Sequence, residues 1–75
     1  MDEDISAGDL RAELAQLEKD LENVRKTAAE VRASVGEADD PADRGALIQA
    51  ADEQDNLAEQ LAARRDDLAR RLAAG

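Results

Sequence analysis

Apolar residues in the first half of the chain recur at alternating spacings of four and three residues. The series is Leu10, Leu14, Leu17, Leu21, Val24, Ala28, Val31 and Val35. This alternation is typical of the a and d positions of a coiled-coil seam, so it predicts one long amphipathic helix. Ser6 is a suitable N-cap, and Gly36, one residue past the last seam position, suits a left-handed C-cap. We therefore expect a first helix over about 7–35.

The second half repeats the same period after a short turn. Asp40 is a suitable N-cap, and Pro41 fits the first helical position, where its missing N–H costs nothing. The second seam consists of Leu47, Ala51, Gln54, Ala58, Leu61, Arg65, Leu68 and Leu72. We expect a turn over about 36–40 and a second helix over about 41–73. Residues 6–75 then form one helical hairpin, preceded by an acidic N-terminal tail over 1–5.

A register test predicts that the two helices face each other. In an antiparallel hairpin, residues that face each other across the seam have numbers with a constant sum. Leu10 with Leu72, Val35 with Leu47 and every seam pair between them add to 82. The sequence therefore predicts an all-α fold, a two-helix antiparallel coiled-coil hairpin that folds back near Pro41.

Charges beside the seam favour the same register. Flanking g positions face g positions in an antiparallel pair, and e positions face e positions. The complementary pairs expected on these flanks are Glu13 with Arg71, Asp20 with Arg64, and Arg25 with Asp55. Exposed pairs of this kind contribute only about 0–1 kcal/mol each, so they select the register more than they stabilise the fold.

The core of such a hairpin is small. Alanine supplies 17 of the hydrophobic residues, and the 75-residue chain has no aromatic side chain. A single core of this size seldom provides more than a few kcal/mol, which favours a partner. The second helix has the broader apolar stripe, because Ala50 and Leu57 widen its seam on one flank and Ile48, Ala62 and Ala69 widen it on the other. We expect this helix to pack against a second copy, so that a homodimer forms a four-helix bundle.

Composition removes several classes of function. Without Cys or His, the chain cannot form disulfides, thiolate or imidazole metal sites, or Cys- or His-based catalytic centres. A net charge of −9 disfavours direct binding to nucleic acid or to an anionic membrane, because both require a cationic surface. We expect no enzymatic activity, cofactor or metal. The acidic residues 1–4 differ from the positive start of a secretory signal, and no long apolar run occurs, so we expect a cytoplasmic location.

Acidic residues cluster around the turn. Asp40 and Asp43 are suited to the start of the second helix, while Glu37 and Asp39 can solvate the turn. Alternatively, these oxygen ligands could bind a hard cation or a partner. The candidate partner-binding residues are therefore Asp39, Asp40 and Asp43 at the turn, together with the apolar positions Ile48, Leu57, Ala62 and Ala69.

Two short stretches resemble known proteins. Residues 40–46, Asp-Pro-Ala-Asp-Arg-Gly-Ala, are similar to the Asp-Pro-x-Asp-Arg-Ala tip of DksA-type proteins, with Gly45 where that pattern has Ala. Residues 10–14 and 50–54 resemble stretches of the Gre-factor coiled coil. Both families regulate RNA polymerase through its secondary channel. The resemblance covers the hairpin alone, since neither the zinc-binding cysteines of DksA nor the globular domain of Gre factors is present among these residues.

Two functions follow as hypotheses. The first is a small non-catalytic interaction or adaptor protein that acts through homodimerisation or through a protein partner that the sequence does not identify. The second, implied by the resemblance, is a regulator of RNA polymerase or another enzyme that inserts its acidic tip into a channel. In that case Asp40 and Asp43 would be the acids acting at the tip.

Overall fold

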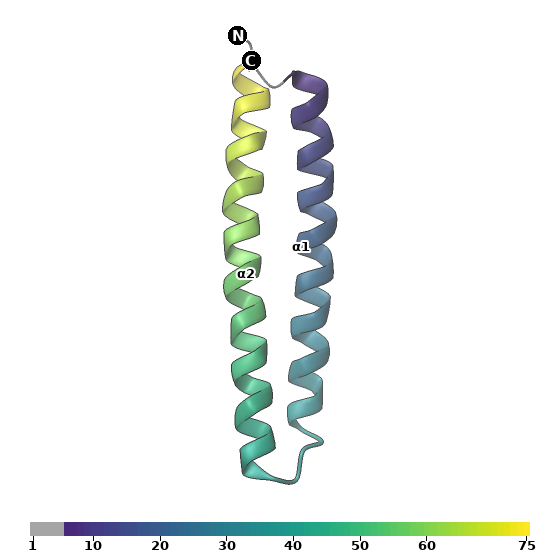
Figure 1. The fold of residues 1–75 in the computed structure, drawn as a ribbon, viewed down its shortest axis with the longest axis vertical. Helices are drawn as coiled ribbons and strands as arrows, with labels where there is room; N and C mark the ends of the chain where they lie inside the picture. Colours follow the sequence, from purple (N-terminus) through teal and green to yellow (C-terminus); the bar gives the residue numbers. More distant parts are fainter. Residues whose placement is uncertain (1–5) are drawn as a thin grey trace.

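The chain forms two long helices that lie side by side and run in opposite directions (Figure 1). A computed structural model describes residues 6–75, with helix α1 at Ala7–Val35 and helix α2 at Pro41–Ala74. At 1.5 Å per residue the helices are about 44 Å and about 51 Å long. This confirms the all-α fold class and the helical hairpin. The acidic tail expected over 1–5 lies outside the described residues.

The start of α1 is capped as its sequence indicates. The Ser6 hydroxyl oxygen accepts a hydrogen bond from the Asp9 N–H at 3.1 Å, which satisfies one of the free donors of the first turn. Its end differs from the expectation, because Gly36 is right-handed, with φ −67° and ψ −17°. The N–H groups of Glu37 and Ala38 instead donate to the Ser34 and Val35 carbonyls in a tighter final turn. These bonds satisfy the last carbonyls without a left-handed residue, so the predicted left-handed cap was wrong.

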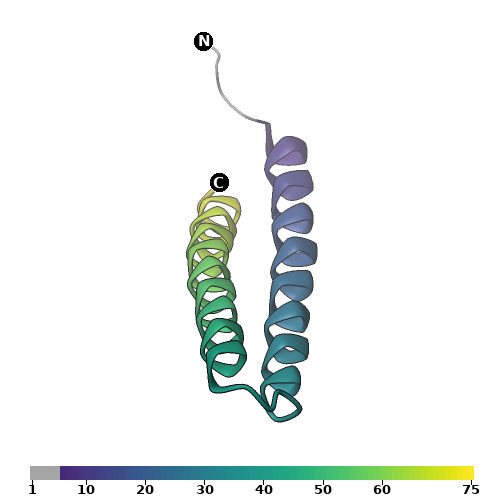
Figure 2. The same cartoon turned by 60° about the horizontal axis from the view of Figure 1, so that its bottom comes forward.

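The turn connects directly to the cap of α2 and comes forward in Figure 2. Asp40 has an extended backbone, and its carboxylate accepts a hydrogen bond from the Ala42 N–H at 3.0 Å, while Pro41 opens the helix. The Arg44 guanidinium donates to the Ala38 carbonyl at 3.1 Å, which ties the first turn of α2 back to the connection. The helix continues to Ala74, one residue past its expected end.

The core is a single line of side chains between the helices. The buried residues are Leu21, Ala28, Ala51, Ala58 and Leu68, and all five are predicted seam positions. Every other seam position of the two helices is half-buried. At the open end, Leu10 and Leu72 line one hollow together, as expected for partners whose numbers add to 82. The seam that the sequence predicts is therefore the seam of the structure.

Two polar residues interrupt this seam. Gln54 is half-buried, and the position expected opposite it is the buried Ala28. Arg65 has only 29% of its side chain exposed, and its guanidinium contacts the Asp66 carboxylate at 3.0 Å. The stem of Arg65 thus covers apolar surface while its charged head reaches an exposed partner. Neither described helix contains a stretch long and apolar enough to cross a membrane.

Leu68 provides the sharpest test of this core. Its side chain is fully buried, whereas Ile48 on the same helix is 49% exposed. We expect Leu68→Ala to lower the free energy of unfolding by about 2–4 kcal/mol, because it opens a cavity between the helices. Ile48→Ala is the matched control and should cost less than about 1 kcal/mol. Urea unfolding followed by circular dichroism, with all samples at one protein concentration, measures both, and equal losses would contradict the packing described.

Candidate interaction surface

Two long faces flank the seam, one on each side of the hairpin. The Ile48 face consists of the e positions Arg11, Glu18, Arg25 and Arg32 of α1 with Ile48, Asp55, Ala62 and Ala69 of α2. The Leu57 face consists of the g positions Glu13, Asp20, Thr27 and Ser34 of α1 with Ala50, Leu57, Arg64 and Arg71 of α2. Because the helices are antiparallel, each face combines like heptad positions from the two helices.

An ion-pair cluster crosses the Ile48 face near the turn. The Arg32 guanidinium donates two hydrogen bonds to the two carboxylate oxygens of Asp55, one of them at 3.3 Å, and lies 3.7 Å from Asp52. The hydrogen bond from Arg32 lowers the pKa of the Asp55 carboxyl and raises the pKa of Arg32. Asp55, with Asp52 nearby, therefore links the two helices on this face and favours their register.

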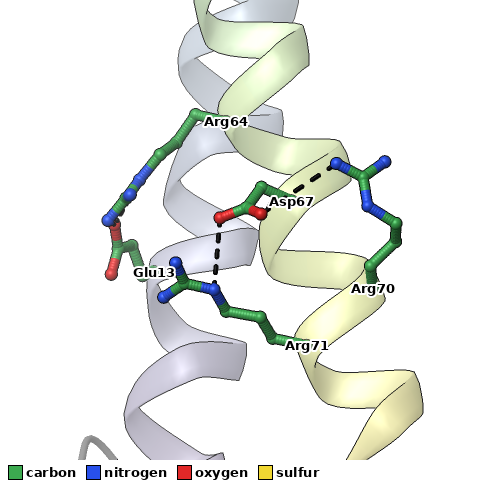
Figure 3. Close-up of polar contacts among 5 residues, drawn as sticks. All are labelled: Glu13, Arg64, Asp67, Arg70 and Arg71. Atoms are coloured by element: carbon green, nitrogen blue, oxygen red, sulfur yellow. Dashed lines mark hydrogen bonds and ion pairs between the residues drawn. The ribbon is translucent and has the colours of Figure 1, made fainter.

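The open half of the Leu57 face also carries a cross-helix ion pair. Arg64 donates to Oε2 of Glu13 through Nη2 at 2.7 Å and through Nε at 3.2 Å (Figure 3). This hydrogen bond raises the pKa of Arg64. Asp67 contacts Arg71 at 3.2 Å and Arg70 at 4.0 Å within α2. The charged residues thus lie in a compact group around the open half of this face.

The structure corrects the predicted partners within these faces. Glu13 binds Arg64 rather than Arg71, because Asp67 engages Arg71 from one turn earlier in the same helix. Asp20 was expected to pair with Arg64, and its carboxylate instead accepts a hydrogen bond from the Gln16 amide at 2.9 Å.

On the other face the partner of Asp55 was also predicted wrongly. Asp55 binds Arg32 instead of Arg25, one heptad away along α1. On both faces, the cross-helix ion pair lies on the predicted flank of the seam, but it joins a different arginine and acid from those predicted. Long arginine side chains span the extra turns easily, so the heptad position determines the face but not the pair.

Before the exposed Asp43, which occupies the g position of α2 at the turn, the Leu57 face has a stretch without a charged g residue. Thr27 and Ser34 of α1 and Ala50 and Leu57 of α2 occupy it, and Leu57 is 40% exposed. The d positions beside them are half-buried, namely Val24, Val31, Leu47 and Gln54. This surface is apolar or neutral over several turns, which distinguishes it from the charged surfaces around it.

The four apolar residues predicted to bind a partner do not share one surface. Ile48 and Leu57 are nine residues apart in α2, which at 100° per residue places them on opposite sides of the helix. Ala62 and Ala69 share the face of Ile48. The broad stripe is therefore divided between two faces, as its two flanks in the sequence indicate. The half-buried d residues beside Leu57 were missed as partner-facing residues, although their heptad positions adjoin the g positions and could have identified them.

The acidic residues of the tip are exposed, and they have separate roles. Asp40 caps α2, while Asp39 and Asp43 are exposed beside it. Within residues 6–75, no group of three or more acidic side chains is arranged to hold a metal ion. At the opposite end of the rod, Leu10, Leu72, Arg11 and Arg71 line an open hollow of about 320 Å³. No buried polar or charged side chain occurs in the described part of the chain.

Comparisons with known proteins give no match, whether the chain is compared with models of protein families, with curated proteins or with solved structures. The likeness to polymerase regulators therefore rests on its short motifs alone and stays a prediction.

The Arg32–Asp55 pair generates a pH prediction. The pKa of Asp55 is lowered by its hydrogen bond to Arg32, so the stability from this pair is present above the ordinary aspartate pKa of about 3.9. It is lost as the pH falls through the lowered pKa. We expect Arg32→Gln to return the Asp55 pKa to the ordinary range, as followed by NMR titration of the carboxyl carbon.

Arg25→Gln is the matched control, since it removes a neighbouring charge on the same face. It should leave most of the Asp55 shift in place. If Arg25→Gln abolished the shift and Arg32→Gln did not, the partner assignment drawn from the structure would be wrong.

Proposed function

We propose that this chain is a small non-catalytic interaction protein that works by pairing its hairpin with a second copy, forming a four-helix bundle. One observation carries the proposal. Of the large aliphatic residues on the seam, only Leu21 and Leu68 are buried, and the others are half-buried. Each half-buried Leu or Val keeps apolar area in water, and covering that area contributes about 25 cal/mol per Å².

The composition of the seam explains why a second layer is favoured. Alanine fills the three buried seam positions 28, 51 and 58, so the single-hairpin core contains little large apolar side chain. Two hairpins packed together would enclose the half-buried residues from both sides, as helices do in four-helix bundles. Two-fold symmetry is the commonest way for a single chain to achieve this.

The distribution of polar groups supports a non-catalytic role. Catalytic sites typically combine a concave pocket with buried groups whose pKa values are perturbed. In residues 6–75 the shifted pKa values belong to exposed ion pairs between the helices, and the one hollow described is open. These groups are suited to fixing the hairpin and its faces.

Sedimentation equilibrium tests the proposal directly. We expect the chain to sediment at micromolar concentration as twice its monomer mass of 8.0 kDa, with helicity and thermal midpoint that rise with concentration, because association stabilises the folded state. A monomer that stays fully helical at high micromolar concentration would contradict the proposal.

We also propose a second function, regulation of an enzyme such as RNA polymerase through the acidic tip. The observation that favours it is the hydrogen bond made by Arg44, the arginine of the first turn of α2. Arg44 donates to a backbone carbonyl, so within the described residues its hydrogen bond does not engage Asp39 or Asp43. The tip therefore presents exposed carboxylates at the end of a narrow rod, a shape and charge suited to entering a cationic channel.

The double variant Asp39→Asn with Asp43→Asn separates the two functions. It leaves the Asp40 cap in place, so the hairpin should keep its helicity and its dimerisation. We expect it to lose any effect of the wild-type chain on in vitro transcription. Asp66→Asn with Asp67→Asn removes the same charge far from the tip and is the control. If the tip variant and the control acted alike, regulation through Asp39 and Asp43 would be excluded.

A further inference from the structure

We propose that two copies pair through their Leu57 faces with both turns at the same end, so that α1 of each copy packs against α2 of the other. This inference rests on the proposed dimerisation and specifies its interface and orientation. Its basis is the order of the residues along the Leu57 face.

The two rows of this face have complementary sequences of side chains. From the open end towards the turn, α1 presents two acids and then two small neutral residues, namely Glu13, Asp20, Thr27 and Ser34. At matching heights α2 presents two arginines and then two apolar residues, namely Arg71, Arg64, Leu57 and Ala50. Corresponding residues have numbers that add to 84. Residues whose numbers add to 82 lie at the same height on the two helices. Residues whose numbers add to 84 are therefore offset by two residues, or about 3 Å along the axis.

A two-fold axis parallel to the rod converts this order into an interface. It places the α1 row of one copy against the α2 row of the other at equal heights. Asp20 then faces Arg64 of the partner subunit, and Thr27 faces Leu57 of the partner subunit. Because the interface is isologous, each of these contacts occurs twice. Acids oppose arginines in the open half, and neutral side chains oppose apolar ones near the turn.

The hairpin leaves the required groups accessible. Arg64 uses Nε and Nη2 on a single oxygen of Glu13, so its Nη1 can donate across the interface. The only hydrogen bond to Asp20 within the described residues comes from the exposed Gln16 amide. Asp20 can therefore accept from an arginine without losing a cross-helix ion pair.

In a dimer with the turns at opposite ends, the charged and apolar side chains that face each other across the interface do not match. It brings α2 against α2 in reverse, so Arg64 and Arg71 approach the apolar Leu57 and Ala50 of the other copy. It also moves Asp20 away from both arginines. Covering charges with apolar groups costs their hydration without a compensating partner. The charge order therefore selects the arrangement with both turns together.

The Ile48 face is less suited to the same pairing. Arg32 lies across it, bound to Asp55 and near Asp52. A two-fold pairing there would set Arg32 against Ile48 of the other copy. Only the Leu57 face combines an exposed leucine with neighbouring uncharged positions on both helices.

Spin-label distances test the orientation in the full chain, which has no cysteine of its own. Single labels at Ala12→Cys, Lys19→Cys and Ala33→Cys lie on the outer side of α1, away from both faces. With a two-fold axis parallel to the rod, all three should report the same distance between copies, within a few ångströms. In a dimer with reversed hairpins, the axial separation changes by about 3 Å for each residue along α1. Distances that vary with height in this way would overturn the proposal.

A matched pair of variants tests the face. Leu57→Asp and Ile48→Asp place the same charge on opposite sides of α2, at its two large exposed apolar residues. We expect Leu57→Asp to weaken dimerisation at least tenfold in sedimentation equilibrium, and Ile48→Asp to change it less than threefold. Circular dichroism should show that both variants keep the helical content of the wild-type chain. Greater sensitivity at Ile48 would overturn the assigned face while leaving dimerisation intact, whereas a monomeric wild-type chain would overturn both the interface and the proposed function.

Discussion

The packing of α1 against α2 through three buried alanines is the constraint on which the structure depends. Ala28, Ala51 and Ala58 lie in the half of the seam nearer the turn, and Leu21 and Leu68 are the large residues buried in the other half. Small side chains bring helix axes close together, since the interaxial distance follows the residues at the contact. The same alanines provide little apolar area to bury. The hairpin therefore has a well-specified register and a thin core, and its Leu and Val residues stay partly exposed.

The sequence predicted this fold well because its signals are local and agree with one another. The four-three alternation places residues on the seam, and Ser6, Asp40 and Pro41 mark helix starts through bonds within a few residues. The conformation of Gly36 was mispredicted because two kinds of helix ending satisfy the same carbonyls, and glycine is compatible with both. The ion-pair partners were mispredicted because an arginine side chain can reach acids in either of two neighbouring heptads of the other helix, and Asp67 competes for Arg71 within its own helix.

The candidate surface could be predicted only in part. The sequence marks Ile48 and Leu57 as unusual apolar positions outside the seam, and both are exposed in the structure. The sequence also assigns them to opposite flanks of the second seam, which correspond to opposite sides of α2. Separating the faces requires the heptad positions of both helices together, because each face combines residues far apart in the chain. The tip shows the same limit, since Asp40 caps a helix while the adjacent Asp39 is exposed, and composition alone does not distinguish them.

In this protein the apolar and charged groups determine different properties. The half-buried Leu and Val side chains can supply affinity for any helical surface, because the hydrophobic effect has no direction. The order of acids and arginines along the Leu57 face supplies direction, since only one orientation of a second copy places Asp20 and Glu13 opposite arginines. That orientation would also bring the acidic turns of two copies to one end. Their repulsion is screened beyond about 8 Å at physiological ionic strength, whereas the pairs across the interface act at contact distance. In the dimer that we propose, contact electrostatics would therefore favour this orientation despite the net charge of −9 on each chain.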